Sequence, residues 1–554
     1  MRISFEPTRL FARLARRVRE RLRGETAATF FDPFSRHDLT RLLAEFDIPV
    51  PSGDPRKALT WEAARSAFDR VREVYELRAD VREVFPLGLT PAQRGQYAAW
   101  LLRYGRAEYG LTADEILGYL FALAEDRSCG LGDTYLLSPE WQRAVPDALT
   151  ESGWKALKTW LAKRYPIRVG RWLRRASRPV RFQTFVSSDA SRTINLLGHF
   201  KYESGLQEEV TQQAATLERL GFRTCLRDVP VSYPRDFNNR ARFTDLELGD
   251  TTIVKLGAQL PLDEAYQRAG LHPRPGVYRI LCWSWELEEF PREAVARAGL
   301  ANEIWAVSEF CAESIRRAMP GVPVFAMPTV ARPHAFEPRP RSHFGLPDER
   351  FLFLFAFDMA SGMERKNPLG LIRAFRKAFS PSESVHLALK VSRGHDHPAD
   401  FARLCREAEA AGATIIDRVM PRSEVQALLA NCDSYVSLHR SEGLGLTMAE
   451  TMLLGKPTIA TGYSGNLDFM TATNSFLVHF DRVKLDRDYP PYPQGCTWAE
   501  PSVEHAASLM RWVYENREEA ATIAKVGQAT VAALLSPAAA AQRMAMRLAE
   551  IRRP

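Results

Sequence analysis

From about residue 193 onward, short apolar runs alternate with stretches in which apolar residues recur every three to four positions. Short runs of this kind are typical of buried strands, and the periodic stretches are typical of amphipathic helices. The first series of runs comprises Thr193–Phe200, Thr251–Leu256, Tyr278–Trp283, Glu303–Ser308 and Val322–Met327. The second comprises Phe351–Phe357, Val385–Val391, Ala413–Ile416, Ser434–Leu438, Pro457–Ala460 and Ser475–Val478. Strands that alternate with helices form parallel sheets covered on both faces, so the two series predict two doubly wound domains joined near residues 328–347.

The rest of the chain carries a helical pattern. Thr90-x-x-Gln93 and Thr112-x-x-Glu115 each resemble a capping box at the start of a helix. We therefore expect an all-helical accessory domain, for which the pattern indicates no chemistry. The predicted segments are a basic arm (1–25), the helical domain (26–180), the first α/β domain (190–335), the second (340–500) and C-terminal helices (501–554).

Composition and charge narrow the classes of protein. The 554 residues are 45% apolar and 26% charged, and no run approaches the roughly 18 apolar residues of a membrane span. The seven cysteines show no metal-ligand spacing, which predicts reduced thiols and a cytoplasmic protein. Within the basic arm, the arginines from Arg9 to Arg23 flank a stripe of leucine and valine. Such a helix can bind the anionic inner face of the plasma membrane, or it can be a solvated arm that docks on its own protein. No motif for nucleic acid accompanies the charge, so we expect no nucleic-acid partner.

The sharpest chemical pattern lies in residues 441–450, directly after a predicted strand. Gly443 and Gly445 precede a helix that is expected to end at Gly455. Ligands of open α/β sheets bind at the carboxyl ends of the strands, and a helix N-terminus favours a phosphate. Glu442 and Glu450 could accept hydrogen bonds from sugar and ribose hydroxyls. The competing interpretation is a chance pair of glutamates on a solvated helix face.

This stretch resembles the E-x7-E motif of the retaining GT-B glycosyltransferases of family 4 (group 1), in their bacterial polysaccharide branch. The similarity extends from about residue 194 to 507 and includes further motifs in the same order. These are Asn195-Leu196-Leu197-Gly198, Glu203-Ser204-Gly205-Leu206, Trp283-Ser284-Trp285-Glu286, Asn302-Glu303-Ile304-Trp305 with Ser308, Arg365-Lys366-Asn367-Pro368 and Gly465-Asn466-Leu467-Asp468. The resemblance implies a GT-B fold, in which two Rossmann-like domains face a cleft. It also implies a nucleoside-diphosphate sugar as donor and transfer to a hydroxyl acceptor with retention of configuration.

The resemblance also implies roles for individual residues. Glu442 would hold the donor sugar, Glu450 the nucleotide ribose, and Lys366 would counter the charge of the diphosphate. The implied catalytic residues are Glu442, Lys366 and Arg365. The implied donor-binding residues are Glu450, Gly443, Leu444, Gly445, Leu446, Gly198, Gly205 and Ser308. The sequence departs from the family in one respect, because the arginine that often precedes the lysine is missing from Phe357–Ser361. Either Arg365 or another cation replaces it, or the leaving group is stabilised less.

An acceptor site is indicated more weakly. Trp283, Trp285 and Glu286 follow a strand and could line a groove for a glycan or glycolipid acceptor, but tryptophans at such positions are equally typical of a core. His199 and Lys201 lie at the end of the first predicted strand and could also face the acceptor side of the cleft. A hydrogen-bonded structural histidine is the simpler interpretation of His199.

We expect neither a metal nor a cofactor. Asp486-Arg487-Asp488 has the spacing of a metal-binding motif but lies in what we interpret as a charged surface loop that includes residues 481–485. The sequence predicts a glycosyltransferase of cell-surface polysaccharide or lipopolysaccharide assembly. The alternatives are another enzyme on the same scaffold, such as an epimerase or a phosphorylase, and a non-catalytic sugar-nucleotide-binding or assembly protein.

Overall fold

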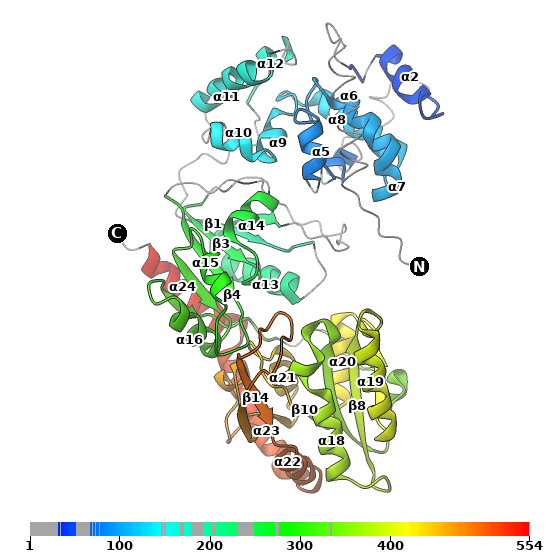
Figure 1. Ribbon diagram of the computed structural model, residues 1–554, viewed down its shortest axis with the longest axis vertical. Helices are drawn as coiled ribbons and strands as arrows, with labels where there is room; N and C mark the ends of the chain where they lie inside the picture. The colour runs from blue at the N-terminus through cyan, green and yellow to red at the C-terminus, as the bar shows by residue number, and fades with distance from the viewer. Residues whose placement is uncertain are drawn as a thin grey trace. The chain divides into compact units, whose positions relative to one another are not determined.

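The computed structural model forms two compact units (Figure 1). The first unit contains residues 1–202, 225–250 and 263–277, and the second contains residues 203–224, 251–262 and 278–554. Within them the structure describes residues 31–33, 35–50, 67–68, 70–72, 74–76, 78–145, 148, 151–166, 171–178, 192–201, 205–229, 247, 249–269, 271, 276–332 and 335–552. The basic arm predicted over residues 1–25 lies outside the described residues.

The helical region predicted before residue 180 is confirmed for its described residues. Its helices are α2 (Arg36–Ala44), α5 (Ala79–Val84), α6 (Arg94–Trp100), the π-helical turn η1 (Leu101–Gly105), α7 (Arg106–Tyr109), α8 (Ala113–Glu125), α9 (Leu131–Leu136), α10 (Pro139–Ala144), α11 (Glu151–Arg164) and α12 (Arg171–Arg175). Their buried faces form two apolar clusters, one around Tyr97 and Tyr119 and the other around Trp141 and Trp154.

One of the two predicted capping boxes is confirmed. The Thr112 side chain accepts a hydrogen bond from the Glu115 amide, and the Glu115 carboxylate accepts one from the Thr112 amide. The capping box predicted at Thr90 is wrong. There the helix begins only at Arg94, because the Gln93 side chain accepts a hydrogen bond from the Leu87 amide (2.8 Å) instead of reaching back to Thr90.

The first sheet contains all five predicted strands and one that the sequence did not predict. Its strands are β1 (Thr193–Gly198), β2 (Arg223–Asp228), β3 (Thr251–Lys255), β4 (Tyr278–Trp283), β5 (Glu303–Ala306) and β6 (Val324–Ala326), in the order β2-β1-β3-β4-β5-β6. The helices among them are α13 (Gly205–Arg219), α14 (Leu262–Arg268), α15 (Arg292–Ala296) and α16 (Glu309–Ala318). Strands β3 to β6 pair in parallel. The sequence missed β2 because arginines and an aspartate interrupt its apolar residues, as an edge strand tolerates.

The second sheet contains the six strands of the second predicted series. They are β7 (Phe351–Asp358), β8 (Val385–Ser392), β9 (Thr414–Asp417), β10 (Ser434–Ser437), β11 (Thr458–Thr461) and β12 (Phe476–Val478), in the order β12-β11-β10-β7-β8-β9. The helices are α17 (Met363–Lys366), α18 (Pro368–Ala378), α19 (Pro398–Ala410), α20 (Arg422–Asn431) and α21 (Leu446–Leu453). Two doubly wound domains are therefore confirmed. Because β7 and β10 are parallel neighbours, α17 after β7 and the glycine turn after β10 lie at the same edge of the sheet.

A two-stranded antiparallel hairpin follows the second sheet. It consists of β13 (Phe480–Lys484) and β14 (Thr497–Pro501). The sequence prediction of a charged loop over residues 481–485 is thus wrong for its first four residues, because charged side chains are tolerated on the solvated face of a two-stranded ribbon. Asp486 and Asp488 are exposed, as predicted.

The C-terminal helices predicted after residue 501 are α22 (Val503–Glu515), α23 (Arg517–Leu534) and α24 (Pro537–Ile551). The first packs on α18, the second on α21 and the third on α13, and Figure 1 shows α24 in red beside the green first sheet. Arg547 fixes α24 through an ion pair with Glu303 (2.5 Å). Among the described residues, one helical stretch, Arg517–Ile551, is long and apolar enough to cross a membrane by length and composition alone. A single stretch of this kind is weak evidence for a membrane span, and this one is divided between α23 and α24.

Candidate functional site

The glycine turn after β10 has the conformation that the sequence predicted. Gly445 adopts a left-handed backbone (φ +90°), and a Cβ there would lie 2.3 Å from the Met448 side chain. Gly465 lies so close to the turn that a Cβ would be 1.9 Å from the Gly443 carbonyl oxygen. Its amide donates to the Glu442 carbonyl (3.1 Å), while the Glu442 amide donates to Ser464 Oγ (2.8 Å). The loop after β11 therefore fixes the position of Glu442 through the backbone.

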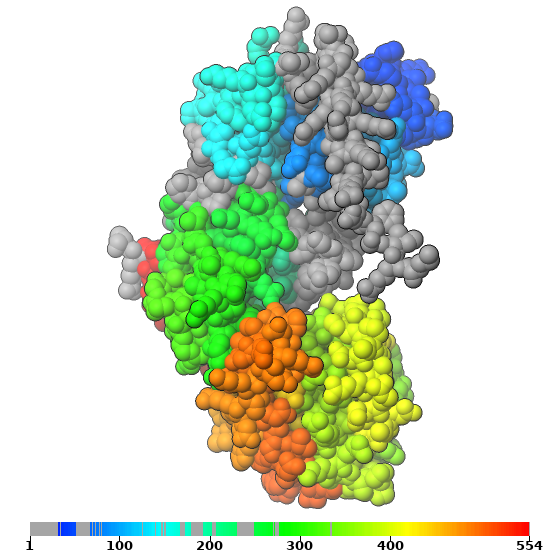
Figure 2. All heavy atoms as spheres, in the orientation of Figure 1, coloured from blue at the N-terminus to red at the C-terminus, as the bar shows by residue number. Residues whose placement is uncertain are grey.

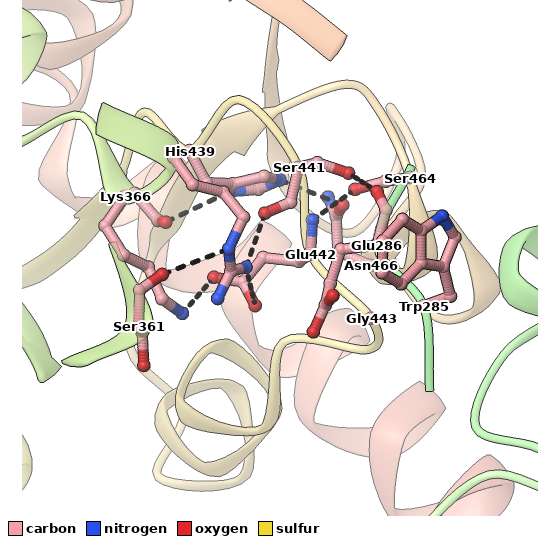
Figure 3. A network of polar contacts seen from close by, with 12 residues as sticks. Trp285, Glu286, Ser361, Lys366, His439, Ser441, Glu442, Gly443, Ser464 and Asn466 are labelled. Carbon is pink, nitrogen blue, oxygen red and sulfur yellow. Dashed lines mark hydrogen bonds and ion pairs between the residues drawn. The ribbon is translucent and has the colours of Figure 1, made fainter. Parts of the chain in front are cut away.

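The Glu442 carboxylate is buried between two cations (Figure 3). Lys366 donates to one oxygen, and the Arg365 guanidinium lies 3.4 Å from the other. Burial alone would raise the pKa of Glu442, but the charges of Lys366 and then Arg365 outweigh it and lower the pKa to about 2. Glu442 is thus an anion at neutral pH, held at the mouth of the turn.

Arg365 is a buried part of this network. It is only 6% exposed although it lies in the short helix α17. Its guanidinium donates to the carbonyls of Ser441 (2.8 Å) and Ser361 (3.2 Å). These bonds join α17 to the turn after β10. The two segments meet because β7 and β10 are neighbours and end at the same edge of the sheet.

A second layer of polar side chains supports the turn from below. His439 Nδ1 lies 3.0 Å from Ser437 Oγ, and its Nε2 lies 3.2 Å from Asn466 Oδ1. Asn466 also donates to the Thr461 carbonyl (3.0 Å). Burial lowers the pKa of His439, so the ring is neutral and bonds as a fixed strut. The sequence motifs include Gly465-Asn466, but no role was predicted for His439 or Ser464. The signal that could have found them is their position, since each is a polar residue close to the end of a predicted strand.

Glu450 lies on α21 and is 3% exposed. One carboxylate oxygen pairs with Arg422 of α20 (2.8 Å), and the other, Oε2, is buried with no hydrogen-bond partner among the described residues. Burial raises the pKa of Glu450 to about 6, and the nearby carboxylate of Glu208 on α13 adds to the effect. A buried acceptor without a donor is costly unless a ligand supplies one. Sequence reasoning missed Arg422.

Between the two glutamates the backbone offers donors. The amides of Gly443, Leu444, Gly445 and Leu446 make no hydrogen bond within the part of the chain that the structure describes. They lead into the N-terminus of α21, whose dipole favours negative charge. The site therefore combines an ionised carboxylate, a lysine, free amides at a helix end and a buried carboxylate oxygen.

Three of the site residues predicted around the first sheet, Ser308, Trp283 and Trp285, are buried. Ser308 is fully buried and caps α16 by accepting from the Cys311 amide (3.2 Å). Trp283 is 1% exposed and stacks on Phe290, so the interpretation as a core tryptophan describes it. Trp285, 3% exposed, donates to the Glu289 carbonyl (2.7 Å).

Glu286 is the predicted acceptor residue that the structure brings to the glycine turn. Its Cγ lies 3.7 Å from the position of a Cβ on Gly443, and its carbonyl accepts a hydrogen bond from Ser441 Oγ. The side chain is half-buried. A carboxylate from the first sheet therefore reaches the turn that carries Glu442.

The roles predicted for His199, Gly198, Lys201 and Gly205 remain predictions. His199 is buried, with Nδ1 2.6 Å from the Val229 carbonyl, which agrees with a structural histidine. Gly198 ends β1, and the Lys201 amide donates to Asp228 (3.0 Å). Gly205 begins α13, the helix that carries Glu208 toward Glu450.

No metal site is indicated within the described ranges. No group of three or more histidine, cysteine, aspartate or glutamate side chains there is arranged so that it could hold a metal ion. The cysteines are free thiols, as predicted.

Comparison with known proteins finds a family model that is similar to the second α/β domain. Residues 341–529 match the model described as glycosyl transferases group 1, which supports the group 1 part of the resemblance. No curated protein matches the sequence.

Solved structures with a similar fold are distant in sequence. HepE of Anabaena, in complex with UDP and glucose, is 14% identical, with a TM-score of 0.46 over 65% of this chain and 100% of that chain. A glycosyltransferase from Rickettsia africae ESF-5 is 14% identical, with a TM-score of 0.48 over 65% of this chain and 98% of that chain. A sucrose-phosphate synthase from Thermosynechococcus elongatus is 15% identical, with a TM-score of 0.48 over 65% of this chain and 99% of that chain. Likeness of this degree says nothing of donor or acceptor.

Proposed function

We propose that this protein is a glycosyltransferase that moves a sugar from a nucleoside-diphosphate sugar to a hydroxyl acceptor with retention of configuration. One observation carries the proposal: an ionised Glu442, neutralised by Lys366, opens a turn of free amides that leads to the buried, partly unpaired carboxylate of Glu450. These are complementary, in order, to sugar hydroxyls, a diphosphate and ribose hydroxyls. The group 1 family match over residues 341–529 supports the same assignment.

The donor would be held by groups already in position. Ribose hydroxyls would donate to Glu450, whose Oε2 lacks a partner among the described residues. The diphosphate oxygens would accept from the amides of Gly443 to Leu446, and Lys366 would add a positive charge. Glu442 would accept from hydroxyls of the donor sugar. Arg365 has a positioning role in this proposal, because its guanidinium is committed to the carbonyls of Ser441 and Ser361.

The reaction would rest on electrostatic stabilisation of the leaving diphosphate. The bond from the anomeric carbon to the diphosphate oxygen breaks, and a bond from that carbon to the acceptor oxygen forms on the same face. The acceptor proton passes to the departing diphosphate, so the scheme needs neither a second carboxylate nucleophile nor a redox partner. Glu286, beside Gly443, is in reach of the acceptor side of such a site.

The family resemblance extends the proposal to context. We place the reaction in cell-surface polysaccharide or lipopolysaccharide assembly, with a glycan or glycolipid as acceptor. The arginines from Arg9 to Arg23 would then bind the anionic inner face of the membrane. We assign no metal, cofactor or nucleic acid to the activity.

A non-catalytic sugar-nucleotide-binding protein is the second candidate. It is favoured by the pairing of Lys366 with Glu442 and by the commitment of Arg365 to backbone carbonyls, which together leave the diphosphate less positive charge. Product formation distinguishes the two candidates, since both predict donor binding.

The test is a thermal-shift panel of UDP, GDP, dTDP and ADP and their common sugar derivatives on the wild type and on Glu450→Ala. A ligand at 100 times its Kd stabilises by about 2.7 kcal/mol, which is visible as a rise in Tm. Glu424→Ala, which removes a half-buried carboxylate of α20 that pairs with Arg418 and His343 and not with Glu450, is the matched control. A shift with one nucleotide series that is lost in Glu450→Ala alone is expected. No shift with any nucleotide would refute the donor site. Nuclear magnetic resonance of the product then checks retention, and an inverted product would refute the mechanism.

A further inference from the structure

The hairpin β13–β14 carries a tyrosine into the candidate site. Tyr492 lies between the two strands and is 6% exposed, although its neighbours in sequence, Pro491 and Pro493, are exposed. Its ring packs against that of Trp285 (5.4 Å between centroids), and its hydroxyl donates to Glu286 Oε2 (2.8 Å). Figure 2 shows the hairpin, in orange, against the green surface of the segment that contains these two residues.

Further bonds hold the hairpin in this position. The Thr497 amide and hydroxyl both donate to the Glu289 carboxylate, at 2.7 and 2.8 Å. Arg482 pairs with Glu288 (3.1 Å). Because several contacts on both strands fix the hairpin, Tyr492 is presented to the site by a rigid element and not by a free loop.

The same tyrosine ring lies under the cationic part of the network. The Arg365 guanidinium is 6.0 Å from the centroid of the Tyr492 ring, at the distance of a cation–π contact. Arg365 in turn donates to the Ser441 carbonyl and lies beside Glu442. One side chain thus touches two groups, Arg365 and Glu286, that converge on the turn from residue 441 to 445.

We propose that Tyr492 is a positioning residue for the sugar-holding end of the donor site. Its ring fixes Arg365 and through it Glu442, and its hydroxyl orients the Glu286 carboxylate beside Gly443. The inference rests on the proposed donor site. It gives a role to a hairpin whose sequence pattern indicated only a charged surface loop.

The position of the contact predicts a selective effect. Tyr492 acts at Glu442, where the sugar would lie, and not at Glu450, where the ribose would lie. Removal of the ring should therefore weaken the binding of a sugar nucleotide and leave the binding of the nucleoside diphosphate unchanged. A general loss of folding would weaken the binding of both ligands alike.

The experiment compares the Kd values of one sugar nucleotide and of its nucleoside diphosphate, taken from the series that shifts the wild type, by calorimetric titration of the full chain. We expect Tyr492→Leu to weaken the sugar nucleotide about tenfold, as the loss of one or two hydrogen bonds would, and the diphosphate less than twofold. Tyr489→Leu is the matched control, because Tyr489 lies on the same hairpin and its hydroxyl donates to the exposed Asp486 (3.1 Å) and not to Glu286. Equal loss of both ligands, or none, overturns the proposal.

A second variant keeps the proposal testable if Tyr492→Leu does not fold. Tyr492→Phe keeps the ring under Arg365 and removes only the hydroxyl that orients Glu286. We expect an unchanged Kd for the sugar nucleotide, because the ring still fixes Arg365 beside Glu442. We also expect several-fold slower formation of nucleoside diphosphate during turnover, because Glu286 lies on the acceptor side of the site. A wild-type rate overturns the role assigned to the hydroxyl. If the wild type itself binds no nucleotide, the proposed function fails; if it binds and both Tyr492 variants behave as wild type, only this inference fails.

Discussion

The raised pKa of Glu450 makes donor affinity depend on pH in a way that the structure specifies. Burial raises this pKa to about 6, and the ionised carboxylate is the form that accepts hydrogen bonds from ribose hydroxyls. The group gains a proton as the pH falls through about 6. Affinity should therefore be complete well above that pH and be lost below it. Arg422, which pairs with one oxygen, favours the ionised form, and Glu208 opposes it.

The size of the effect follows from the pKa. If the donor binds only the ionised form, Kd rises by the factor 1 + 10^(pKa − pH), which is about elevenfold at pH 5 and negligible at pH 8. Glu450→Gln removes the charge and with it a charge-assisted hydrogen bond worth about 1.5–3 kcal/mol, or roughly 10- to 150-fold in Kd. The remaining affinity of the variant should not change between these two pH values.

The assay is calorimetric titration with a sugar nucleotide at pH 5, 6, 7 and 8. A sugar nucleotide is preferable to a nucleoside diphosphate because its diphosphate is a diester and does not titrate in this range. Glu424→Gln, on the neighbouring helix α20, should keep the pH dependence of the wild type. A wild-type Kd that is constant from pH 8 to pH 5, or a Glu450→Gln variant with the same pH dependence as the wild type, would refute the reasoning.

Three further predictions concern the framework of the site. Lys366→Met leaves the buried carboxylate of Glu442 with less positive charge and should lower stability by about 3 kcal/mol, which a second change, Glu442→Gln, should largely restore; calorimetric Tm values check this, and an unchanged Tm for Lys366→Met would contradict it. Gly465→Ala places a Cβ 1.9 Å from the Gly443 carbonyl oxygen, so the turn must move and sugar-nucleotide affinity should fall at least tenfold; an unaltered Kd would show that the turn is not the donor site. Leu354→Ala leaves a cavity in the core beside β7 and should lower the free energy of unfolding, measured with urea, by about 2–5 kcal/mol. Titration of the folded variant should give the Kd of the wild type for the sugar nucleotide.

The sequence determined the architecture of both α/β domains because a buried parallel strand has a signature of its own. Runs such as Phe351–Phe357 are apolar at every position, and all eleven predicted strands are present. The edge strand β2 and the hairpin β13–β14 escaped prediction, since strands that face water on one side or at an edge carry charges and show no apolar run.

The candidate site was predictable in part for a similar reason. The glycines of the turn and the two glutamates lie within ten residues, so their spacing is local information. Their partners are not local. Arg422 lies 28 residues from Glu450, and Lys366 lies 76 residues from Glu442. Only the pairing of β7 with β10 brings the last two together.

Burial and charge state were decided by the tertiary structure alone. The sequence permitted Arg365 to be an exposed helix residue, and only the fold places its guanidinium on the Ser441 carbonyl and over the ring of Tyr492. The pKa of Glu442 falls and that of Glu450 rises although both are glutamates of one motif. Local patterns fix which backbone forms, because hydrogen bonding and side-chain periodicity are short-range, whereas desolvation and charge pairing depend on neighbours that the chain supplies from far away.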